Sequence, residues 1–128
     1  MTEFDLRALL ELLREREIDF IVIGGVAVAA HGFVRGTEDL DLVPDPDPAN
    51  LQRLAAALEQ LADTKFGGLD IIQLAQGVPG YSQLAEDAVD SELLGIPVRV
   101  CSLSMLRQMK EAQGRALDKA DLENLPEG

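Results

Sequence analysis

Residues 18–43, IDFIVIGGVAVAAHGFVRGTEDLDLV, decide the fold of this chain. The segment opens at residues 18–23 with a short, almost wholly apolar run rich in β-branched side chains, which is typical of a strand covered on both faces. Gly24 and Gly25 end that run, and the alanine-rich residues 26–31 after them predict a brief helix that begins directly after the glycines. The local plan is strand, glycine turn, helix.

The end of the same segment predicts a second strand that carries two carboxylates. Residues 38–43, EDLDLV, alternate polar and apolar side chains, so Asp39 and Asp41 project from one face while the leucines between and after them enter the core. Two carboxylates spaced in this way can ligate one hard cation, because their oxygens suit Mg²⁺ or Mn²⁺. We expect Asp39 and Asp41 to form the core of a divalent-metal site.

Asp70 is the candidate for a third ligand. It is an isolated charge inside an apolar strand, and burying it without a cation or partner would be costly, although a strand end at the solvent would explain it too. Gly24 and Gly25 offer backbone N–H groups and a helix start that no side chain blocks, which favours the close approach of phosphate oxygens. A metal held by the three aspartates would bridge those phosphates and present the α-phosphorus of a triphosphate to in-line attack.

The remaining chain alternates helices and strands. Helices are expected over residues 5–16, 48–62 and 117–125, from Ser102 or Ser104 to 113, and briefly from Ser82. Thr2 and Asp5 could form a capping box at the start of the first helix. A strand is expected over residues 69–74, and residues 88–94 and 96–100 resemble a hairpin that turns at Gly95. Only a few residues separate the helix that ends near Ala62 from the strand that begins near Leu69. That connection is either tight or lacks residues in the printed chain.

Three further side chains have a functional and a structural interpretation. Arg35 could clamp a phosphate or pair with a neighbouring carboxylate, and Thr37 could touch the nucleotide or cap the turn before the strand. Lys110 could reach a phosphate or be a solvated lysine on an amphipathic helix. These three residues join Gly24 and Gly25 as candidate nucleotide-binding residues.

Other polar residues are interpreted structurally. His31, the only histidine, is expected to be a packing or helix-end residue, and the single cysteine, Cys101, a buried thiol. Asp118 and Asp121 are expected to cap and solvate the last helix, with Arg115 as a partner.

Composition fits one domain and excludes several classes of function. The chain has 128 residues, of which 47% are hydrophobic, and a formal net charge of −12, so its overall field repels nucleic-acid backbones and no general DNA binding is expected. The longest apolar stretch, residues 20–34, is interrupted and falls short of the roughly 18 residues of a membrane span. The first residues, MTEFD, are acidic where a secretory signal would be basic, which favours a cytoplasmic location without a membrane partner.

Several of these residues together carry a resemblance to a known superfamily. Residues 23–27 (IGGVA), His31-Gly32, Arg35, Thr37 and Asp39-Leu40-Asp41 resemble the glycine-pair and Asp-x-Asp signature of the nucleotidyltransferase superfamily. Within it the chain is most similar to small bacterial proteins related to AbiEii type IV toxins and minimal nucleotidyltransferases (MNT-like proteins). Lys110, Gly114-Arg115 and residues 118–122 resemble the ending of those proteins, so the resemblance covers nearly the whole chain.

The resemblance implies an α/β (α+β) nucleotidyltransferase fold, a mixed sheet flanked by helices, as a single domain over residues 1–128. It implies transfer of a nucleoside monophosphate from a nucleoside triphosphate to a hydroxyl of an RNA end or tRNA, a protein or a small molecule, with Mg²⁺ or Mn²⁺ on Asp39 and Asp41. Asp70 would act as general base or complete a second metal site. Gly25 departs from the many relatives that have a serine there, which leaves only backbone contacts to phosphate.

Two interpretations of the function follow. The first is a metal-dependent nucleotidyltransferase, with a cognate protein partner if it belongs to a toxin–antitoxin pair. The second is a non-catalytic module of the same fold that binds a nucleotide or a partner protein, because fold alone does not separate the two.

Overall fold

The computed structural model describes residues 5–33, 36, 39–62, 68–71 and 78–126, with the backbone alone at 61–62 and 68–70. Its strands form one mixed sheet in the order β3-β2-β1-β5-β4. They are β1 (Phe20–Ile23), β2 (Asp39–Pro44), β3 (Gly68–Ile71), β4 (Val89–Leu93) and β5 (Ile96–Val100). The expected mixed sheet flanked by helices is confirmed.

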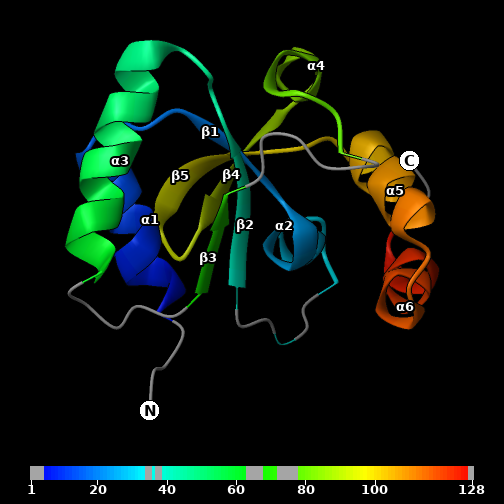
Figure 1. Ribbon diagram of the computed structural model, residues 1–128. Coiled ribbons are helices and arrows are strands. Elements are labelled where there is room, and N and C mark those ends of the chain that lie inside the picture. Colours follow the sequence, from blue (N-terminus) through cyan, green and yellow to red (C-terminus); the bar gives the residue numbers. More distant parts are fainter. Residues whose placement is uncertain (1–4, 34–35, 37–38, 63–67, 72–77, 127–128) are drawn as a thin grey trace.

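Helices cover both faces of this sheet (Figure 1). They are α1 (Leu6–Glu15), α2 (Gly24–Ala30), α3 (Pro48–Ala62), α4 (Tyr81–Glu86), α5 (Leu103–Gln113) and α6 (Ala116–Asn124). Figure 1 shows α1 and α3 together on one side of the strands and α2, α5 and α6 on the other. Across the described residues, no helix is long and apolar enough to cross a membrane.

The central strands carry the core and bring the acidic residues together. Strand β2 runs antiparallel to β1, where Asp41 pairs with Ile23, and parallel to β3, where the backbone of Asp41 is in register with that of Asp70. Leu40 and Leu42 are fully buried, as the alternating pattern predicts. Apolar side chains therefore anchor the same strand that presents Asp41.

The starts of two helices differ from expectation. Asp5 is itself the N-cap of α1, because its side chain accepts a hydrogen bond from the Ala8 N–H, so it is not the inner residue of a capping box; Thr2 lies outside the described residues. Helix α2 begins at Gly24 rather than after the glycines. Gly24 has a φ of +69°, and this left-handed residue lets the strand turn directly into the helix.

The C-terminal elements follow local signals closely. The hairpin between β4 and β5 turns at Leu94 and Gly95, whose φ angles of 53° and 82° suit a type I′ turn. Ser102 caps α5 by accepting a hydrogen bond from the Met105 N–H, and Gly114 ends α5 in the left-handed conformation. The expected end of the third strand, residues 72–74, and the connection at 63–67 lie outside the described residues.

Candidate functional site

A cavity of about 470 Å³ lies between the strands β1, β2 and β3 and the helices α5 and α6. Its apolar lining includes Ile23, Ile71, Val78, Leu106 and Met109, and its polar lining consists of Gly24, Asp41, Lys110, Gln113, Arg115 and Asp118. The apolar wall lowers the effective dielectric, so charges facing the cavity interact more strongly than they would in open water. The site therefore combines a central strand carboxylate with a charged wall from the last two helices.

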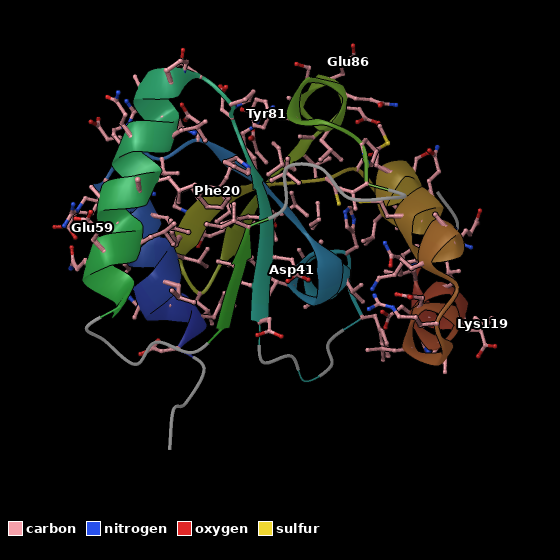
Figure 2. The ribbon with its side chains drawn as sticks, in the orientation of Figure 1. Phe20, Asp41, Glu59, Tyr81, Glu86 and Lys119 are labelled. Carbon is pink, nitrogen blue, oxygen red and sulfur yellow. The ribbon has the colours of Figure 1, made fainter. Side chains whose placement is uncertain are left out.

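Asp41 and Gly24 are packed directly against each other. A Cβ atom built on Gly24 would overlap the Asp41 carboxylate and would lie 3.0 Å from its Cγ. Gly24 is thus required twice, once for its positive φ and once for the close approach of the Asp41 side chain. Figure 2 shows Asp41 on β2 beside α2, so the expected proximity of the glycine turn to the acidic strand is present.

The two other candidate metal ligands lie around Asp41. Asp39 is exposed at the start of β2, in register with Gly68, while Asp41 is partly buried in the cavity. Asp70 is described by its backbone alone, and that backbone is beside Asp41. Among the described side chains, no group of three or more His, Cys, Asp or Glu residues is arranged to hold a metal ion, so the three-carboxylate site stays a prediction.

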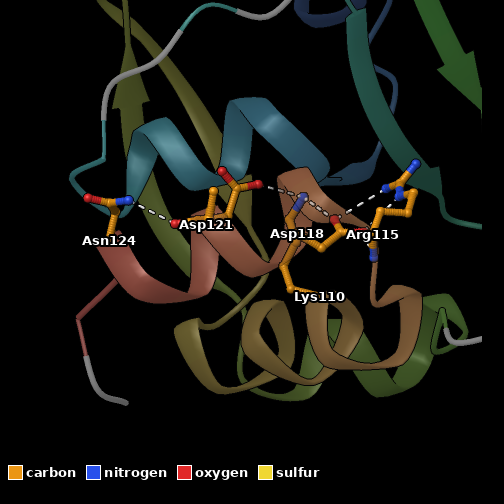
Figure 3. Close-up of polar contacts among 6 residues, drawn as sticks. Lys110, Arg115, Asp118, Asp121 and Asn124 are labelled. Atoms are coloured by element: carbon orange, nitrogen blue, oxygen red, sulfur yellow. Dashed lines mark hydrogen bonds and ion pairs between the residues drawn. The ribbon is translucent and has the colours of Figure 1, made fainter.

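Lys110, Asp118 and Asp121 form a buried ionic cluster, of which Lys110 and Asp118 line the cavity (Figure 3). The Lys110 Nζ lies 3.1 Å from Asp118 Oδ1 and 3.0 Å from Asp121 Oδ2, and both carboxylates are fully buried. This corrects the expectation that Asp118 and Asp121 are solvated, and it corrects the interpretation of Lys110 as a solvated lysine. Burial without a partner would be costly for each charge, so the three groups neutralise one another across the α5–α6 contact.

Arg115 extends the cluster to the cavity rim. Asp118 Oδ2 accepts hydrogen bonds from Arg115 Nε at 2.7 Å and from its backbone N–H at 3.1 Å, and Oδ1 accepts one from a terminal guanidinium nitrogen at 3.3 Å. Burial raises the pKa of Asp118, but the hydrogen bonds from Arg115 and Lys110 outweigh it and leave the pKa below its ordinary value. Asp118 therefore stays ionised and holds the guanidinium in a fixed plane.

Asp41 also acts on Arg115. The hydrogen bond and charge of Asp118 are the main causes that raise the pKa of Arg115, and the charge of Asp41 adds to them. Both residues line the same cavity. The guanidinium therefore sits within the electrostatic reach of both carboxylates.

The remaining candidates divide into placed and unplaced residues. Gly25 is buried in the first turn of α2, whereas Arg35 and Thr37 lie outside the described residues. His31 caps the end of α2, and its Nε2 lies 2.8 Å from the Cys101 carbonyl oxygen, which fits its expected role at a helix end.

Cys101 is a buried thiol, as expected. Burial raises its pKa to about 12, so it remains protonated at neutral pH and is unsuited to act as a nucleophile.

Arg115 is the site residue that sequence reasoning missed. Its position after Gly114 indicates a helix boundary and a partner for Asp118, and its match to the ending of the AbiEii-like and MNT-like proteins assigns it no role in a cavity. The spacing of Asp118 and Asp121 by three residues does place them on one helix face, and Lys110 on the preceding helix is the cation that this face could meet. That pattern was the available signal for a buried cluster.

Comparison with known proteins is informative at the level of fold. Neither a protein-family model nor a curated protein sequence matches the chain. The solution structure of the antibiotic-resistance factor ANT(2'')-Ia, an aminoglycoside nucleotidyltransferase, is similar with a TM-score of 0.58 and 20% identity, covering 92% of this chain and 72% of that chain. A crystal structure of ANT(2'')-Ia in complex with adenylyl-2''-tobramycin gives a TM-score of 0.48 and 16% identity over 90% of this chain and 91% of that one. The chain has the nucleotidyltransferase fold.

Proposed function

We propose that this chain is a metal-dependent nucleotidyltransferase, which transfers a nucleoside monophosphate from a nucleoside triphosphate to a hydroxyl acceptor. The observation that carries the proposal is the contact between Asp41 and Gly24 in the cavity of a nucleotidyltransferase fold. Because Gly24 has no side chain, the Asp41 carboxylate lies directly against the glycine turn, which brings a cation ligand next to backbone N–H groups that can bind phosphate oxygens.

The residues present fit a divalent cation. Asp41 opens into the cavity, Asp39 lies two residues earlier on the same strand, and the backbone of Asp70 is in register with Asp41. Carboxylate oxygens are the donors that Mg²⁺ and Mn²⁺ prefer, so we assign Asp39, Asp41 and Asp70 as ligands. When bound, such a cation neutralises phosphate charge and stabilises the leaving pyrophosphate.

The chain's own residues have further roles in the proposal. Asp70 takes the proton of the acceptor hydroxyl or completes a second metal site. Gly24 and Gly25 offer backbone N–H groups to phosphate, and Arg35 and Thr37 are assigned to the nucleotide from the sequence motif. We do not assign Lys110 to direct phosphate contact, because its ammonium is buried between Asp118 and Asp121.

Separate observations support three classes of acceptor hydroxyl. Similarity of fold to an antibiotic-resistance factor supports a small-molecule hydroxyl. The sequence resemblance to AbiEii-like and MNT-like proteins supports an RNA end, a tRNA or a protein side chain, together with a toxin–antitoxin partner. The three acceptor classes share one chemistry, so they are best separated by a direct assay.

The test is transfer of label from α-³²P nucleoside triphosphates, with Mg²⁺ or Mn²⁺, to total RNA, to cell-extract protein and to an aminoglycoside panel. Asp41→Asn should lower transfer on the order of a hundredfold or more, because it removes a negative ligand charge from the site. Asp90→Asn is the matched control, since Asp90 is an exposed strand carboxylate on β4, away from the cavity. Chelation with EDTA should abolish transfer, and added Mg²⁺ or Mn²⁺ should restore it.

Two outcomes would overturn the proposed enzymatic activity. Transfer by Asp41→Asn at the wild-type rate would remove Asp41 from the chemistry. Binding of triphosphate without transfer to any of the three acceptor classes would favour the non-catalytic module instead.

A further inference from the structure

Among the described residues, two cations line the cavity, and they differ in exposure. The Lys110 ammonium is enclosed by Asp118 and Asp121, and its side chain is 7% exposed. The Arg115 side chain is 68% exposed and lines the same cavity as Asp41. Among the described lining residues, Arg115 is therefore the only exposed cation.

The attachment of Arg115 fixes its direction. Asp118 accepts hydrogen bonds from Nε and from one terminal nitrogen, so one edge of the planar guanidinium is occupied (Figure 3). A guanidinium has five N–H donors, and a two-point contact with one carboxylate uses two of them. The remaining donors form a second edge, and planar guanidinium edges match phosphate oxygens well.

The buried cluster explains why this arrangement is rigid. Asp118 Oδ1 also receives the Lys110 ammonium, and Lys110 in turn contacts Asp121 one turn along α6. Burial leaves these groups few alternative partners, so the carboxylate that orients Arg115 is itself held from the opposite side. Loss of Asp118 would release Arg115 from its plane, although Arg115 would keep its charge.

We propose that Arg115 binds the phosphate groups beyond the α-phosphate of a nucleoside triphosphate, and that Asp118 is its positioning residue. The inference deepens the proposed function and rests on it for the identity of the nucleotide. Asp41 and Gly24 line the cavity from β2 and the start of α2, and Arg115 lines it from the N-cap of α6. A triphosphate whose α-phosphate is at Asp41 could therefore extend its β- and γ-phosphates toward Arg115 within the same cavity.

The test is equilibrium binding by calorimetry in Mg²⁺, with ATP, AMP and inorganic tripolyphosphate as three separate ligands. Arg115→Gln should weaken ATP and tripolyphosphate binding by about tenfold to a hundredfold, the effect expected for charge-assisted hydrogen bonds, and should change AMP binding less than about twofold. Arg115→Lys should be intermediate, because it keeps the charge but loses the planar edge. Arg7→Gln is the matched control, since Arg7 is an exposed arginine that pairs with Glu11 on the opposite side of the sheet.

The positioning role has its own readout. Asp118→Asn should weaken ATP binding in the same direction as Arg115→Gln, and the double variant should be no weaker than Arg115→Gln alone, since the two residues act through one contact. Additive losses would instead assign Asp118 a separate role. Circular dichroism of each variant identifies any that fail to fold, and Arg115→Gln, on an exposed side chain, carries the test if Asp118→Asn is one of them.

The outcomes separate this inference from the proposed function. Selective loss of ATP affinity in Arg115→Gln supports the inference even if no acceptor is labelled, in which case the proposed transfer fails alone. Normal transfer with unchanged ATP affinity in Arg115→Gln overturns the inference alone. Equal losses for ATP and AMP, or no triphosphate binding by the wild type, also overturn it.

Discussion

Gly24 shows how a single residue can be constrained by both backbone and neighbour. Its φ of +69° is a left-handed conformation that costs a residue with a side chain about 1–2 kcal/mol. The Asp41 carboxylate in addition occupies the space where a Cβ would lie. The positive φ and the close contact can be tested separately, because Gly32, Gly95 and Gly114 have a positive φ without such a contact.

Gly24→Ala should therefore destabilise the fold by about 2–5 kcal/mol, the sum of left-handed strain and local overpacking. Chemical denaturation measures this change, and the proposed transfer activity should fall with it because Asp41 must move. Gly95→Ala is the matched control: its φ is +82° and a Cβ there meets nothing within 4 Å. It should cost only the strain, about 1–2 kcal/mol, and an equal loss in both variants would contradict the contact with Asp41.

At the scale of elements, the pairing of α5 with α6 depends on a buried cation. Lys110 comes from α5 and both of its carboxylate partners come from α6, so the ionic cluster joins the two helices across their contact. Removing one partner of such a cluster leaves buried charge uncompensated, which is more costly than removing the whole cluster.

Lys110→Met should lower the free energy of unfolding by about 3–5 kcal/mol, because Asp118 and Asp121 would remain buried without their shared cation. Urea denaturation followed by circular dichroism measures it. Lys119→Met on the exposed side of α6 makes the same chemical change and should stay within about 0.5 kcal/mol of wild type. A similar small effect for Lys110→Met would mean that the cluster is not a stabilising contact.

Elements were predictable where their signals were local. The hairpin at Gly95 and the cap at Ser102 follow from a few adjacent residues, and both are where the sequence indicates. The burial of Lys110 was not predictable from its own helix, because it depends on which face of α6 docks there. The place of Arg115 in the site is not predictable for the same reason: Asp41, which lines the same cavity, is distant in sequence, and the two meet because α5 and α6 pack beside the strands.

At the scale of the whole molecule, acidic residues far outnumber basic ones. A formal net charge of −12 favours solubility and repels polyanions, while cations within the site act locally. Acid titrates all the carboxylates together, so a single group is visible only by comparing two variants that share the rest of the titration.

Such a comparison predicts how Asp118 contributes to stability. Its folded pKa lies below the ordinary 3.8, so its contribution is present above that value and is lost as the pH falls through the folded pKa. Wild type should thus be more stable than Arg115→Gln by about 1 kcal/mol at pH 7, a modest value because Arg115 is largely exposed. Denaturation from pH 7 to 2 should show the difference shrinking below about pH 3.8. A difference that grows in acid would reverse the sign of the interaction.

The residues that line the cavity are synthesised at different times. Gly24 and Asp41 belong to the first half of the printed chain, whereas Arg115 and the carboxylate that orients it belong to its last part. Contacts between such distant segments form late in folding, and synthesis proceeds from the N-terminus. Gly24 and Asp41 are therefore made well before Arg115 and Asp118. A molecule cut after β3 would carry Gly24 and Asp41 but lack Arg115, so under our proposal it would lose the contacts to the phosphate groups beyond the α-phosphate.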